Sequence, residues 1–205
     1  DKIKWKQDIQ NDIEKLEELL EYSIQVDNNR DKKLQTLKQT IESKIKNPLN
    51  GENKKVIIFT AFADTAQYLY DNISLWAKNL GVESCLITGS GINQSTLFPK
   101  ERDLNTLLTH FSPISKDRAK IDSTQSKELD ILIATDCISE GQNLQDCDFL
   151  INYDIHWNPV RIIQRFGRVD RLGSKNKYIQ LVNFWANMEL DEYINLESRV
   201  SGRMV

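Results

Sequence analysis

Several features that would define a class of protein are missing from this sequence of 205 residues. Its three cysteines, Cys85, Cys137 and Cys147, are an odd number without metal-ligand spacing, and only two histidines accompany them, so no metal site is expected. We interpret the cysteines as reduced residues of an intracellular, cytoplasmic protein. No run of about eighteen apolar residues occurs, so no membrane span is expected. A net charge of −3 argues against binding of nucleic acid through bulk positive charge.

Glycine and proline are absent from residues 1–47. Without these helix breakers, the segment is predicted to form two amphipathic helices, at about 3–26 and 30–46. Their apolar stripes are Ile9, Ile13, Leu16, Leu19, Leu20 and Ile24 in the first, and Leu34, Leu37, Ile41 and Ile45 in the second. The stretch "NPLNGEN" then interrupts the pattern as a turn or linker. We expect residues 1–50 to form a helical hairpin that packs on a second domain, residues 51–205.

From residue 54 onward, short apolar runs alternate with helical segments. The predicted strands are "KVIIFT", "ESCLITG", "LDILIAT", "CDFLINYD" and "YIQLVNFW". The predicted helices are "DTAQYLYDNISLWAKNLG", "PKERDLNTLLTHF", "NPVRIIQRFGRVDR" and "MELDEYINLESRV". Continuous apolar runs suit strands that are buried on both faces, so the pattern predicts an α/β fold, a parallel sheet with helices on both faces. The polar residues 112–128 are predicted to be a mobile surface insertion.

Polar residues follow three of the predicted strands at their carboxyl ends. They are Thr60, the pair Thr135 and Asp136, and Asp154. In open α/β folds, ligands bind at the carboxyl ends of the strands. The helix rich in arginine begins four residues after Asp154. We therefore expect these residues and the arginines to converge on one edge of the sheet.

The segment "RIIQRFGRVDR", residues 161–171, places four arginines on one stripe of a predicted helix: Arg161, Arg165, Arg168 and Arg171. Like charges at this spacing repel, and Gly167 inside a helix costs roughly 1 kcal/mol relative to alanine. A stripe that carries both penalties suits the binding of an anion, because the planar guanidinium group matches phosphate. The alternative is an exposed basic helix end.

Together these segments resemble a known set of motifs. "ATDCISEGQNLQ" followed by "LINYDIHWNPVRIIQRFGRVDR" is similar to motifs V and VI of superfamily 2 helicases, and "KVIIFTAFADTAQYL" is similar to motif IV. "EGQNLQ" and "NYDIHWNP" most resemble the bacterial members of the Swi/Snf-related branch, although the usual "RIGQ" after motif VI is "RLGS" here. The resemblance covers about residues 54–200. It implies a RecA-like fold of the P-loop NTPase type, the second, C-terminal lobe of a helicase.

The resemblance also implies roles for individual residues. Arg168 and Arg171 match the arginine fingers that reach ATP phosphates across the cleft between the lobes, and Gln164 matches the residue that couples the phosphates to motif VI. The residues expected on the nucleotide side are Glu140, Gly141, Asn143 and Gly167. The residues expected to contact the nucleic-acid backbone are Thr60, Gly89, Ser90 and Thr135.

Structural alternatives stand beside several of these assignments. Salt bridges explain Arg161 and Arg165 equally well, and ordinary strand-end residues explain Thr60 and Thr135. Asp136 could equally be a helix N-cap. Trp157 could stack on a base but more often such a residue packs a loop, and His110 and His156 are expected to be structural.

In such enzymes the first RecA-like lobe carries the phosphate-binding loop and the carboxylates that hold Mg²⁺. This sequence has no G-x-x-x-x-G-K-[ST] motif and no strand that ends in a D-E pair. Its ends, "DKIKWKQ" without an initiator methionine and "SGRMV", are expected to be cuts through a longer protein. The resemblance therefore implies that the first lobe of the same polypeptide binds ATP and Mg²⁺, and that this chain alone is inactive as an ATPase.

The expected further partner is nucleic acid, with double-stranded DNA favoured, and no membrane. A second hypothesis is a degenerate RecA-like lobe that docks a partner or nucleic acid without taking part in ATP turnover. A nucleotide-binding dehydrogenase is disfavoured, because no G-x-G-x-x-G motif follows the first strand.

Overall fold

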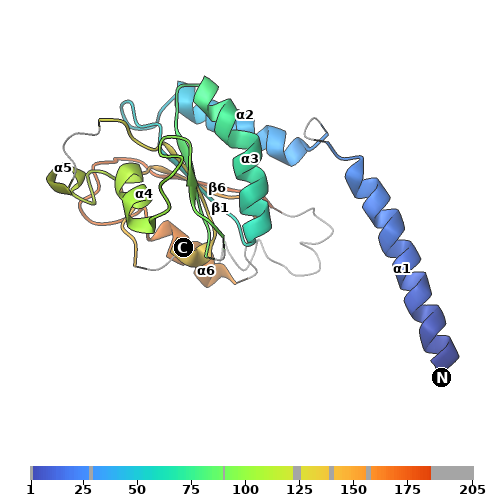
Figure 1. Cartoon of the computed structure of the whole chain (residues 1–205). Helices are drawn as coiled ribbons and strands as arrows, with labels where there is room; N and C mark the ends of the chain where they lie inside the picture. The colour runs from blue at the N-terminus through green and yellow to red at the C-terminus, as the bar shows by residue number, and fades with distance from the viewer. Residues whose placement is uncertain are drawn as a thin grey trace. The chain divides into compact units, whose positions relative to one another are not determined.

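A computed structural model of the chain describes residues 2–27, 30–89, 91–121, 126–138, 141–155 and 158–185 (Figure 1). The chain divides into two compact units, Asp1–Thr40 and Ile41–Val205. The predicted closing helix, residues 188–200, lies outside the described residues. No helix among those described is long and apolar enough to cross a membrane.

The first unit contains α1 (Lys2–Ile24) and the beginning of α2 (Lys32–Lys46), which confirms both predicted helices. Asp31 caps α2, because its carboxylate accepts a hydrogen bond of 2.9 Å from the Leu34 N–H. Leu34, Leu37 and Ile41 on the predicted stripe of α2 are fully buried. The predicted stripe of α1 is exposed along its whole length, from Ile9, Ile13, Leu16, Leu19 and Leu20 to Ile24. The boundary at residues 50 and 51 stays a prediction.

The second unit is built on a six-stranded sheet with the order β3-β2-β4-β1-β5-β6. Its strands are β1 (Val56–Phe59), β2 (Ser84–Ile87), β3 (Gln94–Ser95), β4 (Ile131–Ala134), β5 (Phe149–Asn152) and β6 (Gln180–Asn183). All pairings are parallel except the one between β2 and the two-residue edge strand β3, which the sequence pattern did not reveal. The predicted parallel sheet is confirmed.

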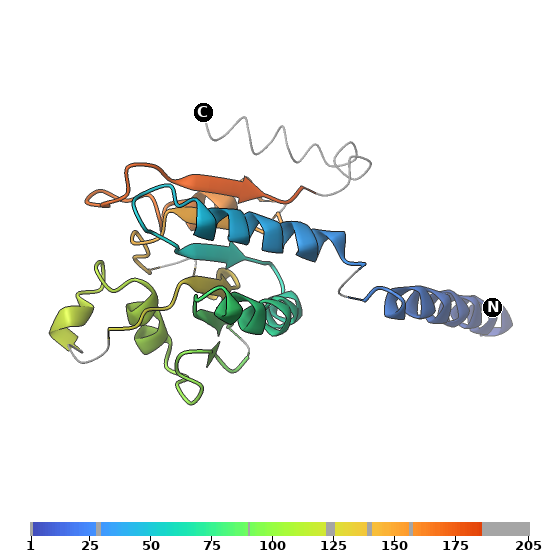
Figure 2. The same ribbon diagram turned by 90° about the horizontal axis from the view of Figure 1, so that it is seen from above.

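Helices cover both faces of this sheet. They are α3 (Ala63–Asn79), α4 (Leu104–Phe111), the single turn α5 (Arg118–Ile121) and α6 (Pro159–Phe166), with a 3-10 turn, η1 (Asp136–Ile138), after β4. Helix α3 lies on one face and α4 on the other (Figures 1 and 2). Every residue of β1, β2, β4 and β5 is buried, as expected for strands that are covered on both faces.

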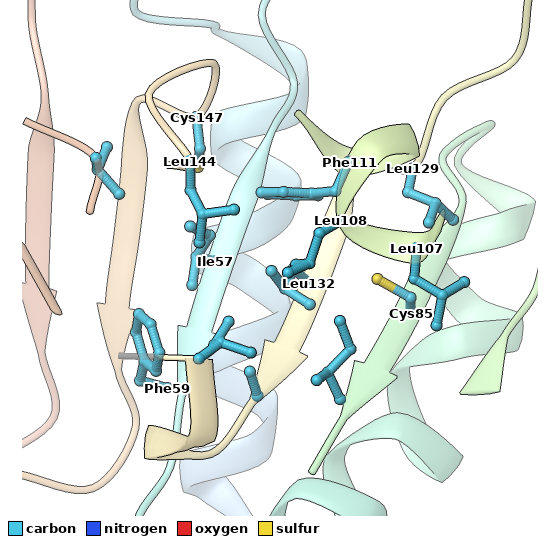
Figure 3. Packing of buried hydrophobic residues seen from close by; sticks show 14 of the residues in the cluster. Ile57, Phe59, Cys85, Leu107, Leu108, Phe111, Leu129, Leu132, Leu144 and Cys147 are labelled. Carbon is cyan, nitrogen blue, oxygen red and sulfur yellow. The ribbon is translucent and has the colours of Figure 1, made fainter. Parts of the chain in front are cut away.

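The core on the α4 face consists of alternate strand residues that meet the apolar side of the helix (Figure 3). Ile57 and Leu132 pack there with Leu108 and Phe111 of α4. Helix α6 belongs to the same face, because the Arg165 guanidinium lies 5.1 Å from the ring centroid of Phe59, in the same cluster as Ile57.

The first residues of the polar segment 112–128 are hydrogen-bonded to the rest of this unit. The N–H groups of Ile114 and Ser115 donate hydrogen bonds of 2.6 and 2.9 Å to the carboxylate of Asp146, just before β5. Ser112 and Pro113 are buried. Residues 122–125 lie outside the described part, so the predicted mobility of the segment stays a prediction.

Candidate functional site

The parallel strands all end at one edge of the sheet, here called the carboxyl edge. Thr60 follows β1, Thr135 follows β4 and Asp154 lies two residues after β5. Two of them are joined directly, since the Thr60 hydroxyl donates a hydrogen bond of 2.5 Å to Asp154 Oδ2. The prediction that these residues share one edge is therefore confirmed.

Thr60 is fully buried at this edge, and Thr135 is only 9% exposed. With its hydroxyl given to Asp154, the Thr60 side chain supports a neighbour and does not face solvent. A direct contact with a nucleic-acid phosphate would require this hydrogen bond to open. The backbone around both threonines is held between neighbouring strands, because the Thr60 N–H donates to Ala134 O at 3.0 Å and the Thr135 N–H to Ile87 O at 3.3 Å.

The predicted arginine stripe is not uniform, because Arg165 is fully buried. Its Nε and Nη2 donate to the two carboxylate oxygens of Asp136, at 2.7 and 2.9 Å. Its Nη1 donates to Asn152 Oδ1 at 2.9 Å and to the backbone oxygen of Asp154 at 3.4 Å. Arg165 thus fills the structural role that stood as its alternative. Such bidentate pairing is what makes a buried guanidinium tolerable.

Helix α6 is shorter than predicted. The Asn158 side chain caps its start by accepting a hydrogen bond of 3.0 Å from the Val160 N–H. It ends at Phe166, and Gly167 is its C-cap residue, whose N–H donates to Ile163 O at 2.9 Å. The expectation that Gly167 sits inside the helix is therefore wrong, and the glycine penalty that was assigned to the helix does not apply.

The two candidate finger arginines follow the end of α6 and lie away from the carboxyl edge. The Leu144 N–H donates to Arg168 O at 3.0 Å, and Leu144 precedes β5. Figure 3 shows Leu144 beside Cys147, at the opposite end of β1 from Phe59. The expectation that the arginines share the edge of Thr60 is thus wrong for Arg168 and Arg171, because α6 runs back along the sheet before they occur, whereas Arg165 does meet Asp136 and Asp154 at that edge.

Arg171 is exposed and points its guanidinium into the turn after α6, where Nε donates to Gly167 O at 3.1 Å. It lines an open cavity of about 450 Å³ together with Asp170, Ser174 and Lys177. A larger cavity of about 650 Å³ adjoins it and shares Gly173, Asn176 and Lys177. This surface offers the Arg171 and Lys177 cations to an anion, beside the Asp170 carboxylate, while the Ser174 hydroxyl already donates to Gln145 O at 3.1 Å.

The chain from η1 to β5 contributes the neighbouring loop. Gly141 is exposed with φ +72, a conformation that favours glycine. Asn143 Oδ1 accepts a hydrogen bond of 3.3 Å from the Gln145 N–H. Gln164 Oε1 is buried and, among the residues that the structure describes, has no hydrogen-bond partner. Glu140 lies outside the described residues, so its predicted role is untested.

Gly89 lies where the loops after β2 and β4 meet. A Cβ atom added there would come within 3.2 Å of the Cys137 Cβ atom, so a small residue suits this approach. Ser90, His156 and Trp157 lie outside the described residues. His110 is buried and packs on the Phe98 ring at 4.4 Å between centroids, in agreement with its predicted structural role.

Comparison with known families shows to which family the chain belongs. The profile of the helicase conserved C-terminal domain matches residues 32–173. The chain belongs to this family. The coarser part of the predicted resemblance, a helicase C-terminal domain, is therefore confirmed.

Individual relatives agree with this assignment. The chain is 42% identical over 67 residues to an uncharacterized ATP-dependent helicase, YqhH, of Bacillus subtilis, covering 33% of the chain and 12% of the relative. It is 30% identical over 172 residues to a probable ATP-dependent RNA helicase, ddx51, of Dictyostelium discoideum, covering 83% of the chain and 27% of the relative. The chain thus spans a small part of the length of both.

Solved structures show the same fold. The C-terminal part of the Fun30 ATPase domain superposes with a TM-score of 0.57 at 20% identity, over 85% of this chain and 48% of that one. The Hef helicase domain of Pyrococcus furiosus superposes with a TM-score of 0.53 at 22% identity, over 82% of this chain and 28% of that one. The RecA-like fold predicted for the helicase C-terminal domain is confirmed.

In this helicase C-terminal domain, the sequence pattern did not reveal the role of Asn152 in the buried network around Arg165, and it revealed that of Asp136 only in part. The strand pattern predicts Asn152 only as part of an apolar strand, yet its Oδ1 accepts a hydrogen bond from Arg165 and its Nδ2 donates to Asn183 Oδ1 at 2.8 Å. Asp136 was considered as a helix cap, and it does open η1, but its carboxylate also binds Arg165. A polar residue that ends a fully buried strand is the signal that could have pointed to Asn152.

Proposed function

We propose that this chain is the second motor lobe of an ATP-dependent nucleic-acid translocase or helicase, related to the bacterial Swi/Snf-like branch. The observation that carries the proposal is the turn after α6, which contains Arg168 and the exposed Arg171. The hydrogen bond from the Leu144 N–H to Arg168 O holds this turn against the loop from η1 to β5. Membership of the helicase C-terminal domain family supports it. The branch is argued from "EGQNLQ" and "NYDIHWNP".

In this proposal the lobe supplies positive charge to the phosphoryl transfer from ATP that is bound mainly by another lobe. Arg168 and Arg171 stabilise charge on the transferred phosphoryl group, a contribution of about 10³–10⁵ in rate for arginine fingers. Gln164 is assigned to the same role from its match to motif VI, and its buried Oε1 has no partner in the described part of the chain. Gly141, Asn143 and Gly167 complete the nucleotide side, with Glu140.

The carboxyl edge takes the nucleic acid in this proposal. Thr135, Gly89 and Ser90, with Thr60 after rearrangement, contact phosphate oxygens through hydroxyl and backbone N–H groups. Double-stranded DNA is the proposed substrate, as in Swi/Snf-like motors. The relatives' own names include an RNA helicase, so RNA is the outcome that the substrate test must distinguish.

ATP and Mg²⁺ are proposed to bind mainly to a first RecA-like lobe of the same polypeptide. No group of three or more His, Cys, Asp or Glu residues that could hold a metal ion occurs in the described ranges. When bound, Mg²⁺ would neutralise phosphate charge, and Arg168 and Arg171 of this chain would add positive charge at the transferred phosphoryl group.

The test uses a protein that carries both lobes and measures phosphate release at saturating DNA duplex. Arg171→Ala should lower kcat by about 10³ or more with little change in ATP affinity, since the guanidinium acts on the transition state. Lys78→Ala, which removes an exposed charge from α3, is the matched control and should keep full turnover. Near-normal turnover by Arg171→Ala would refute the finger assignment. An RNA duplex of the same sequence tests the nucleic-acid class.

A further inference from the structure

Arg165 joins parts of the sheet that are far apart in the sequence. From one side chain on α6 it reaches the carboxylate of Asp136, immediately after Thr135, and the end of β5 through Asn152 and the Asp154 oxygen. The ends of β4 and β5 are therefore fastened to the same helix. No other side chain of α6 is both charged and fully buried.

A third strand end belongs to the same network. Thr60, after β1, donates its hydroxyl hydrogen bond to Asp154 Oδ2 at 2.5 Å, and the backbone oxygen of Asp154 accepts from Arg165. Two of the residues proposed to contact nucleic acid, Thr60 and Thr135, are thus linked to Arg165, one through Asp154 and the other through its chain neighbour Asp136. A phosphate that drew the Thr60 hydroxyl away would break the hydrogen bond that joins Thr60 to Asp154 Oδ2.

The other end of α6 leads directly to the candidate finger arginines. Arg168 follows Arg165 by three residues, and the Arg168 N–H donates to Arg165 O at 3.1 Å. Ile162 and Val169, on either side of Arg165 in the sequence, are fully buried, so the helix and its following turn are packed as one piece. A displacement of Arg165 should therefore move Arg168 with it.

We propose that Arg165 is a positioning residue that couples nucleic-acid binding at the carboxyl edge to the placement of Arg168 and Arg171. The proposal rests on the function proposed above. It differs from a role in stability alone, because it requires that occupation of one site changes affinity at the other. By linkage, nucleotide bound between the lobes should then change the affinity for nucleic acid by the same factor as the reverse.

The test measures this factor in a protein that carries both lobes. The dissociation constant for a short DNA duplex is measured with and without a nonhydrolysable ATP analogue, at a temperature where every variant is folded. In the wild-type protein the ratio of the two constants should be about 5–150, the usual size of allosteric coupling. Asp136→Asn and Arg165→Lys, which keep hydrogen-bonding groups but lose the bidentate ion pair, should bring the ratio to about one.

A second buried ion pair provides the control. Lys44 Nζ lies 2.6 Å from Asp148 Oδ1, and both side chains are fully inaccessible, but Asp148 stands just before β5, away from the carboxyl edge. Asp148→Asn should lower the melting temperature as the Arg165 variants do and leave the coupling ratio unchanged.

Three outcomes would overturn the inference, and they are distinguishable. A wild-type ratio of one would refute the proposed motor function as well. A large wild-type ratio that persists in both Arg165-network variants would refute only the positioning role. An equal loss of the ratio in Asp148→Asn would show that general destabilisation is the cause.

Discussion

The division of the arginine stripe can be tested by the stability of the isolated chain. Replacing Arg165 by methionine removes a fully buried guanidinium and leaves the Asp136 carboxylate without its bidentate partner. Breaking a buried ion pair in this way costs about 3–5 kcal/mol. The Asp136 side chain is 23% exposed, so water reaches it and the lower end of that range, about 3 kcal/mol, is expected. Arg171→Ala, at an exposed position, should change stability by less than about 0.5 kcal/mol.

Urea denaturation followed by circular dichroism measures both changes as shifts of the midpoint at constant slope. The double variant Arg165→Met with Asp136→Leu should recover a large part of the loss, because the carboxylate that lost its bidentate partner is then also gone. If Arg165→Met lost less than about 1 kcal/mol, the ion pair would not be the anchor that its geometry indicates. Equal losses in Arg165→Met and Arg171→Ala would mean that the stripe is uniform after all.

Two further predictions concern titratable groups outside the site. Cys85 and Cys147 are buried, and burial raises the pKa of both thiols, that of Cys147 to about 12, whereas Cys137 is exposed. A thiol reagent should therefore label one cysteine rapidly in the native chain and three after denaturation. Rapid labelling of a second cysteine in the native chain would contradict this prediction. Burial raises the pKa of the Asp130 carboxyl, so the native state binds this proton more tightly than the unfolded chain, and the free energy of unfolding should lose a contribution as pH rises from about 4 through the folded pKa. Asp130→Asn should remove that loss and be the more stable protein at neutral pH, which denaturation at several pH values can check; identical pH profiles would show that the raised pKa is absent.

Much of the fold could be predicted because its information is local. Each central strand is a run of four buried residues, such as "VIIF" or "ILIA", and such runs are recognisable without knowing their neighbours. The connections that alternating strands and helices allow limit the possible topologies to a few, but the sequence pattern predicted no strand order. The edge strand β3 escaped prediction because two residues, Gln94 and Ser95, carry no periodic signal.

The sequence by itself determined that four arginines recur at helical spacing and that polar residues follow three strands. Only the tertiary structure decided which arginine is an anchor. Periodicity treats Arg165 and Arg168 alike, but the fold brings Asp136, 29 residues before Arg165, and Asn152 into hydrogen-bonding distance of the Arg165 guanidinium. A buried charge is stable where oppositely charged and hydrogen-bonding groups surround it, and those groups come together through the pairing of strands. The tertiary structure also decided at which edge of the sheet Arg168 lies. The length of α6 fixes how far the chain runs back along the sheet before that residue occurs.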